Sequence, residues 1–228
     1  MDKFVNIEDE NSEIATFEGT TNDGGTFYMF YPYSSTLYAK DYDKIDFTLP
    51  ASQTYAKETF TSNAMPMVAK GSPQQTLQFY SLCGVLGLNL KGSETIQSIS
   101  FTGKDANGAP LPVAGDYYVY MGYEDAPEIY TRNSNNTATV TLNCGEGVAL
   151  DPVDSTAFYI VLPPATYESF NIIIATTDGK VMLKESSKPL TISRTNVTKT
   201  GALTYVANET IDLSTLGTAN SYIVSEPG

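Results

Sequence analysis

The sequence predicts an all-β protein, an antiparallel β-sandwich or barrel with few and short helices. The 228-residue chain is rich in residues that favour strands, with 16 Tyr and 10 Phe. Short apolar or alternating runs recur along the chain, and turn residues separate them, as in sandwiches and barrels. No stretch longer than about ten residues carries the 3.6-residue period of a helix.

Composition and charge exclude several classes of function. The net charge of −13 argues against nucleic-acid binding, because phosphates are bound by Lys and Arg. The chain has no histidine, so it cannot form a Ser-His-Asp or Cys-His nucleophile or a His-containing zinc site. Its two cysteines are too few for a four-Cys zinc site. We therefore expect no catalytic residues, no cofactor and no metal.

Residues 1–75 form a predicted N-terminal β region. Its strand candidates are Phe27–Tyr31, Ile45–Leu49 and Met65–Ala69, each followed by a proline or a turn. A region of this length is thin for an independent sandwich. It is therefore either incomplete or packs against its neighbour.

Residues 76–207 form a predicted C-terminal β-sandwich with a stronger strand pattern. Four leucines share one parity, so a strand here would bury one leucine face. They are Leu82, Leu86, Leu88 and Leu90. In Thr137–Cys144 the even-numbered residues are apolar and face inward, whereas the odd-numbered residues are polar. Asp178 and Gly179 predict a two-residue hairpin with a type I′ turn, because both positions need positive φ.

Several phrases, in order along the chain, resemble the fimbrillin-like proteins of Bacteroidetes, which include major and minor fimbrial subunits and surface lipoproteins. In the C-terminal half they are Leu82-Cys-Gly-Val-Leu86, Thr141-Leu-Asn-Cys-Gly145 and Tyr159-Ile-Val-Leu-Pro-Pro-Ala-Thr-Tyr167. In the N-terminal half they are Phe30-Tyr-Pro-Tyr33, Phe47-Thr-Leu-Pro-Ala-Ser-Gln-Thr-Tyr55 and Met67-Val-Ala69. The resemblance therefore covers about Phe30 to Tyr205.

The resemblance implies two β-sandwich domains of transthyretin-like topology and export to the cell surface. The protein would be anchored at the outer membrane or built into fimbriae, with any lipid anchor upstream of this chain. The resemblance also implies assembly by β-strand addition, in which an open sheet edge accepts a strand from a neighbouring subunit. Lys3 is the only basic residue before Lys40, and no arginine precedes Arg132. Lys3 is therefore the only candidate site for trypsin-like trimming in the N-terminal segment. Otherwise we expect any trimming to occur upstream of this chain.

Two groups of residues are candidate sites. The tail, residues 208–228, contains the strand-like triplet Tyr222, Ile223 and Val224. This triplet is a candidate donor strand, but it could also be an appended strand of this fold, part of a separate short tail, or the opening of a further module, which it resembles. Tyrosines beside the loop Gly122–Asn136 are a candidate recognition surface, because loops on rigid sandwiches carry function and tyrosines anchor ligands. That surface comprises Tyr117, Tyr118, Tyr120, Tyr123 and Arg132.

Two smaller motifs leave alternatives open. Cys83 and Cys144 could form a disulfide, but Cys83 lies opposite the leucine face, which favours two buried thiols. Asp41, Asp43 and Asp46 could bind Ca²⁺, but the spacing is not that of an EF-hand, and a solvated acidic loop is favoured.

The sequence thus predicts a surface-displayed, non-catalytic fimbrial subunit or adhesin. Its expected partners are other fimbrial subunits through strand exchange, with a host protein or a glycan as a further partner. The alternative is a non-polymerising surface lipoprotein that binds glycan or host protein through Tyr-rich loops. An enzyme using paired carboxylates is a third class, although no pair of carboxylates stands out in the sequence.

Overall fold

A computed structural model describes residues 5–6, 17–18, 26–33, 37–41, 43–72, 77–122, 126–132, 136–207 and 209–210. These residues form β-strands joined by turns and loops, with one 3-10 helix, Ser62–Ala64. The prediction of an all-β chain is therefore confirmed. Within the described ranges no helix has the length and hydropathy that a membrane span requires.

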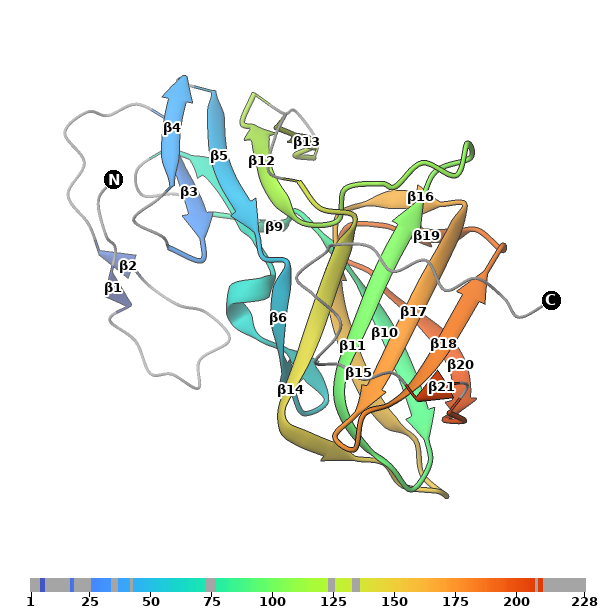
Figure 1. Cartoon of the computed structure of the whole chain (residues 1–228). Helices are drawn as coiled ribbons and strands as arrows, with labels where there is room; N and C mark the ends of the chain where they lie inside the picture. Colours follow the sequence, from blue (N-terminus) through green and yellow to red (C-terminus); the bar gives the residue numbers. More distant parts are fainter. Residues whose placement is uncertain are drawn as a thin grey trace.

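Two facing sheets form a β-sandwich that dominates the fold (Figure 1). The first sheet has the order β15–β10–β20, and β10 pairs antiparallel with β15 but parallel with β20. Its strands are β10 (Gly84–Lys91), β15 (Thr156–Leu162) and β20 (Val197–Thr204). The two edges of this sheet are therefore β15 and β20.

The second sheet has the order β21–β18–β17–β11–β14–β6–β7. All of its neighbours are antiparallel except β14 and β6, which are parallel. Its strands are β6 (Ser52–Ala56), β7 (Thr59–Phe60), β11 (Thr95–Lys104), β14 (Thr139–Ala149), β17 (Ser169–Thr176), β18 (Lys180–Ser186) and β21 (Glu209–Thr210).

The core of the sandwich comes from residues that alternate along these strands. Leu86, Leu88 and Leu90 of β10 are fully buried there, which confirms three of the four predicted members of the leucine face. The fourth, Leu82, precedes β10 and is buried in a second core. On β14, Val140, Leu142 and Cys144 face this core and Asn143 is exposed, as the alternation predicted. Burial of one face of each strand stabilises the pairing of both sheets, since each buried Leu or Ile contributes roughly 1.5–3 kcal/mol.

A second core lies beside the first and draws on both halves of the chain. Its four-stranded sheet has the order β13–β12–β5–β4, and its three-stranded sheet has the order β3–β8–β9. These strands are β3 (Phe27–Tyr31), β4 (Tyr38–Asp41), β5 (Lys44–Leu49), β8 (Met67–Gly71), β9 (Tyr80–Ser81), β12 (Gly115–Tyr120) and β13 (Ile129–Thr131). Two further pairs are β1 (Val5–Asn6) with β2 (Phe17–Glu18), and β16 (Ala165–Tyr167) with β19 (Leu190–Ile192).

Strand pairing crosses the boundary that we predicted between residues 75 and 76. β12 pairs with β5, and β6 joins the sandwich by pairing with β14. β10 also serves both cores, since Val85 packs in the second and Leu86 in the first. The boundary, and the division into two sandwich domains of transthyretin-like topology, stay predictions.

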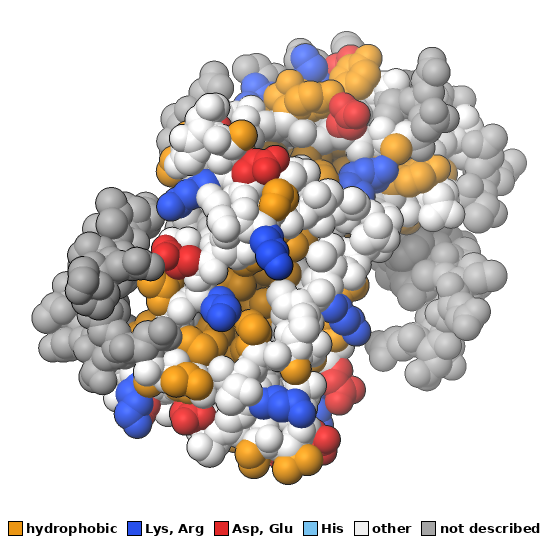
Figure 2. Space-filling model, turned by 90° about the vertical axis from the view of Figure 1, so that its right-hand side faces the viewer, with side chains coloured by type: hydrophobic (Ala, Val, Ile, Leu, Met, Phe, Trp, Pro, Cys, Tyr) orange, Lys and Arg blue, Asp and Glu red, His pale blue; other side chains and the backbone are white. Residues whose placement is uncertain are grey.

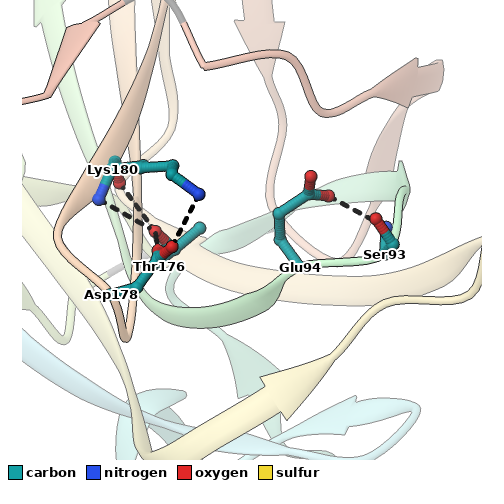
Figure 3. Close-up of polar contacts among 5 residues, drawn as sticks. All are labelled: Ser93, Glu94, Thr176, Asp178 and Lys180. Atoms are coloured by element: carbon teal, nitrogen blue, oxygen red, sulfur yellow. Dashed lines mark hydrogen bonds and ion pairs between the residues drawn. The ribbon is translucent and has the colours of Figure 1, made fainter.

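The turn between β17 and β18 differs from the predicted type I′ hairpin. Of its residues only Gly179 has a positive φ, 82°. Its N–H donates to the carbonyl of Thr176 (3.1 Å), which makes a three-residue loop. Thr176 Oγ1 donates to Asp178 and accepts the Lys180 N–H (Figure 3). The Thr176 hydroxyl therefore replaces a ladder hydrogen bond, and Asp178 stays in an ordinary conformation.

Candidate functional site

The sandwich has two lateral sides, and a side chain joins its sheets on one of them. The backbone of Gln53 in β6 is in register with Leu142 of β14, in the second sheet. Its side-chain Nε2 donates to the carbonyl of Val161 in β15 of the first sheet (2.8 Å), and its Oε1 accepts the Val161 N–H (2.9 Å). Gln53 therefore supplies the hydrogen bonds that a neighbouring strand would give to this edge.

We call this the bridged side and define it by Gln53, Tyr55, Cys144, Phe158 and Val161. The rings of Tyr55 and Phe158 pack across it with centroids 5.3 Å apart. Cys144 is 7% exposed, and its burial raises the pKa of the thiol to about 11. Gln53 itself is only 5% exposed, so water does not compete for its hydrogen bonds.

Both cysteines are free and buried. Cys144 belongs to the sandwich core and Cys83 to the second core. The interpretation of two buried thiols is therefore confirmed. Burial raises the pKa of the Cys83 thiol far above its ordinary value.

The opposite side of the sandwich lies between β20 and β18, and we call it the open side. In the part of the chain that the structure describes, β20 pairs with β10 alone. β18 pairs with β17 and, only at Lys180 and Val181, with β21. Figure 2, which faces this side, shows hydrophobic side chains gathered in a hollow with Lys and Arg side chains close by.

β20 is exposed over most of its length, and within the described residues it pairs along one edge alone. Five of its eight residues are exposed, which leaves Leu203 as the residue that packs against the sandwich core. The hydroxyl of Thr200 is buried and has no hydrogen-bond partner among the described residues. An edge strand with exposed residues and an unsatisfied polar atom is one that a further strand could complete.

Three of the candidate recognition residues lie on β12, on two different faces, because successive residues of a strand point to opposite sides. Tyr117 is only 2% exposed, packs in the second core and donates its hydroxyl to the carbonyl of Pro112 (3.0 Å). Its inclusion in a recognition surface was therefore wrong. Tyr118 and Tyr120 face outward, and Tyr120 is 41% exposed. Tyr123 lies outside the described residues.

Tyr118 is the centre of a polar and aromatic cluster on the outer face of β5, β12 and β13. Its ring stacks on Tyr130, with centroids 5.2 Å apart and planes 22° apart. The Arg132 guanidinium lies 5.0 Å from the Tyr118 centroid and the Lys44 ammonium 5.8 Å. Arg132 also forms an ion pair with Asp46 and donates to it through Nε (2.9 Å).

Strand register explains why these residues meet. Asp46, Tyr118 and Tyr130 lie directly opposite one another on β5, β12 and β13. We call Lys44, Asp46, Tyr118, Tyr130 and Arg132 the aromatic row. Asp46, which the sequence offered as a Ca²⁺ ligand or a solvated group, thus pairs with an arginine. Tyr130 was not among the predicted recognition residues, because the sequence predicts a loop over Gly122–Asn136 where the structure forms β13.

The rim of the aromatic row carries a further carboxylate. The hydroxyl of Tyr130 donates to Glu128 (2.7 Å), and this hydrogen bond raises the pKa of Tyr130. Tyr130 is 43% exposed, so its ring presents a hydrophobic surface between charged groups. Such a surface can stack on a flat partner and hydrogen-bond at its edges.

No family model and no curated protein matches the chain. The described residues contain no group of three or more Cys, Asp and Glu side chains placed to hold a metal ion. The predicted donor strand, Tyr222 to Val224, lies outside the described residues. Among the residues that the structure describes, the open side and the aromatic row are the two surfaces on which a function is proposed below.

Proposed function

We propose that this chain is a non-enzymatic, surface-displayed subunit that assembles by β-strand addition, as its resemblance to fimbrillin-like proteins implies. Export, an outer-membrane or fimbrial location and two sandwich domains of transthyretin-like topology belong to the same proposal. The open side is the observation that carries it. An added strand there would hydrogen-bond to an edge and bury hydrophobic side chains, which together supply affinity and register.

The direction of the chain at β21 supports this proposal. β21 is antiparallel to β18, with Glu209 opposite Val181 and Thr210 opposite Lys180. At Thr210 the chain therefore points past the beginning of β18 and away from the rest of that strand. We propose that Tyr222, Ile223 and Val224 serve as a donor strand for the open side of another copy, with Tyr222 and Val224 on the same face.

The test compares the oligomeric state of three chains by light scattering over a range of concentrations. The full chain should form concentration-dependent assemblies, whereas a chain that ends at Ala207 should remain monomeric. The variant Ile223→Pro should also remain monomeric, because proline removes a ladder hydrogen bond while β21 is left intact. A matched Ile223→Val variant should still assemble.

Two results would contradict the proposal. One is a full chain that stays monomeric at every concentration with the same stability as the truncated chain. The other is assembly of Ile223→Pro equal to that of Ile223→Val, which would mean that the tail does not add as a strand.

A second candidate function is a non-polymerising surface protein that binds a glycan or a host protein. The exposed aromatic row favours it, because aromatic residues and arginine anchor many interfaces. This function predicts a stable monomer whose melting temperature rises with ligand. The same light-scattering series therefore separates the two functions, since only strand addition predicts assembly.

A further inference from the structure

We propose that the aromatic row is a binding site for a neutral carbohydrate. The exposed ring of Tyr130 would stack on one face of a pyranose ring, and Asp46, Arg132 and Glu128 would hydrogen-bond to its hydroxyl groups. This site lies on β5, β12 and β13, away from β18 and β20, and does not depend on strand addition.

The ring that supports the site is already fixed before a ligand arrives. Tyr118 is held between Tyr130, Arg132 and Lys44, and the Arg132–Asp46 ion pair ties β13 to β5 across it. Tyr130 is fixed at both ends, by its stacking on Tyr118 and by its hydroxyl on Glu128. Binding therefore costs little side-chain conformational entropy, which favours the affinity of a small ligand.

The polar groups of the site match hydroxyl groups, which both donate and accept hydrogen bonds. Carboxylates at Asp46 and Glu128 can accept, and the guanidinium of Arg132 can donate. Arg132 engages Asp46 through Nε and Nη2, both with Oδ1, so the pair does not require Nη1 or Oδ2. A ring surface beside both kinds of group fits a sugar, whose faces are apolar and whose edges are polar.

Charge and size select the class of ligand. Two carboxylates, Asp46 and Glu128, balance two cations, Lys44 and Arg132, so the site offers no excess of positive charge for a polyanion. A stable protein interface takes roughly 20–30 residues on each side, far more than this cluster provides. The structure therefore assigns to this face one or a few pyranose rings without charge.

The test screens the full chain against immobilised neutral oligosaccharides built from glucose, galactose, mannose and N-acetylglucosamine, with sialylated and sulfated glycans alongside. Any binder is then titrated in solution by NMR. We expect a neutral oligosaccharide to bind, and Tyr130→Ala to weaken its affinity by about tenfold or more through loss of stacking. Tyr130→Phe, which keeps the ring, should stay within about threefold of the parent chain.

Matched variants separate binding from folding. Tyr28→Ala removes another exposed strand tyrosine, 37% exposed on β3, and should leave affinity unchanged. Arg132→Lys keeps the charge but loses the planar fork, so it should weaken binding at an unchanged fold. The proposal is overturned if no neutral oligosaccharide binds, if only the acidic glycans bind, or if both Tyr130→Ala and Arg132→Lys bind like the parent.

Discussion

The two lateral sides of the sandwich solve the problem of an exposed sheet edge in different ways. On the bridged side β6 pairs with one sheet, and its Gln53 side chain hydrogen-bonds to Val161 of the other. On the open side β20 pairs only with β10 within the described ranges, and the Thr200 hydroxyl has no partner there. The buried backbone groups of Val161 are thus hydrogen-bonded on the bridged side, whereas the buried hydroxyl of Thr200 on the open side lacks a hydrogen bond.

This difference shows where the fold is complete and where another strand could join it. The strand that closes the bridged side comes from the N-terminal region, so the second core and the sandwich depend on each other. On the bridged side the Gln53 side chain already hydrogen-bonds to the backbone N–H and carbonyl of Val161, so these two groups are not available to a further strand. An edge such as β20 keeps its outer groups for a partner. Four predictions test the contrast.

The largest effect is expected from Gln53→Ala. This substitution leaves the N–H and the carbonyl of Val161 buried without partners, and each unsatisfied group costs about 1–3 kcal/mol. We expect the free energy of unfolding to fall by about 3 kcal/mol, as measured by urea denaturation. The control is Thr54→Ala at the next, exposed position of β6, which should change stability little. A loss below about 1 kcal/mol for Gln53→Ala would mean that water replaces the amide.

The second prediction uses Cys144 as a probe of the bridged side. Burial and a pKa of about 11 keep this thiol unreactive near neutral pH, because the thiolate is the reactive form. Opening of the bridged side in Gln53→Ala should raise the labelling rate of Cys144 by about tenfold or more.

Mass spectrometry of the labelled peptides separates Cys144 from Cys83, which serves as the internal reference. Cys83 is fully buried in the second core, which also holds Val161, and its labelling should accelerate less than that of Cys144. If the two thiols accelerate equally, the substitution loosens the whole molecule and not the bridged side.

The third prediction has the opposite sign and concerns the open side. Thr200→Val replaces a buried hydroxyl that lacks a partner with a methyl group of similar size. We expect stability to be unchanged or to rise by about 0.5–1 kcal/mol in the same urea experiment. The matched variant is Thr198→Val two residues earlier, where Oγ1 donates to the carbonyl of Thr191 (3.2 Å). That variant should lose about 1 kcal/mol. Equal losses for both would mean that the Thr200 hydroxyl is satisfied in solution.

The sequence predicted strands and buried faces better than it predicted how the strands pair. Alternation within a strand is local, so the inward positions of Val140 and Leu142 and the leucine face of β10 were predictable. Pairing between distant segments is not local. Nothing in Ser52–Ala56 indicates that Gln53 will bond to Val161, 108 residues away, or that β12 will pair with β5.

The candidate recognition surface shows the same limit. Tyr118, Tyr120 and Arg132 could be proposed from the sequence because they lie in or beside a Tyr-rich strand and loop. Tyr117 was included wrongly because a doublet of tyrosines does not reveal which member faces the core. Asp46 and Tyr130 join the site only through register between three strands, which a single sequence does not specify.

The smallest effect is expected at the β17–β18 turn, beside the open side. Hydrogen bonds from Lys180 and Thr176 lower the pKa of Asp178 from its ordinary value of 3.8 to about 2. Because the folded-state pKa is the lower one, the carboxylate stabilises the fold above about pH 4, and this contribution is lost as the pH falls towards 2. Asp178→Asn should therefore flatten the pH dependence of the urea midpoint over that interval. Part of the pH dependence should remain in this variant, because the pKa of Asp151 is also lowered. If NMR titration of Asp178 gives an ordinary pKa, or if Asp178→Asn leaves the pH profile unchanged, the turn contributes through Gly179 and the Thr176 hydroxyl alone.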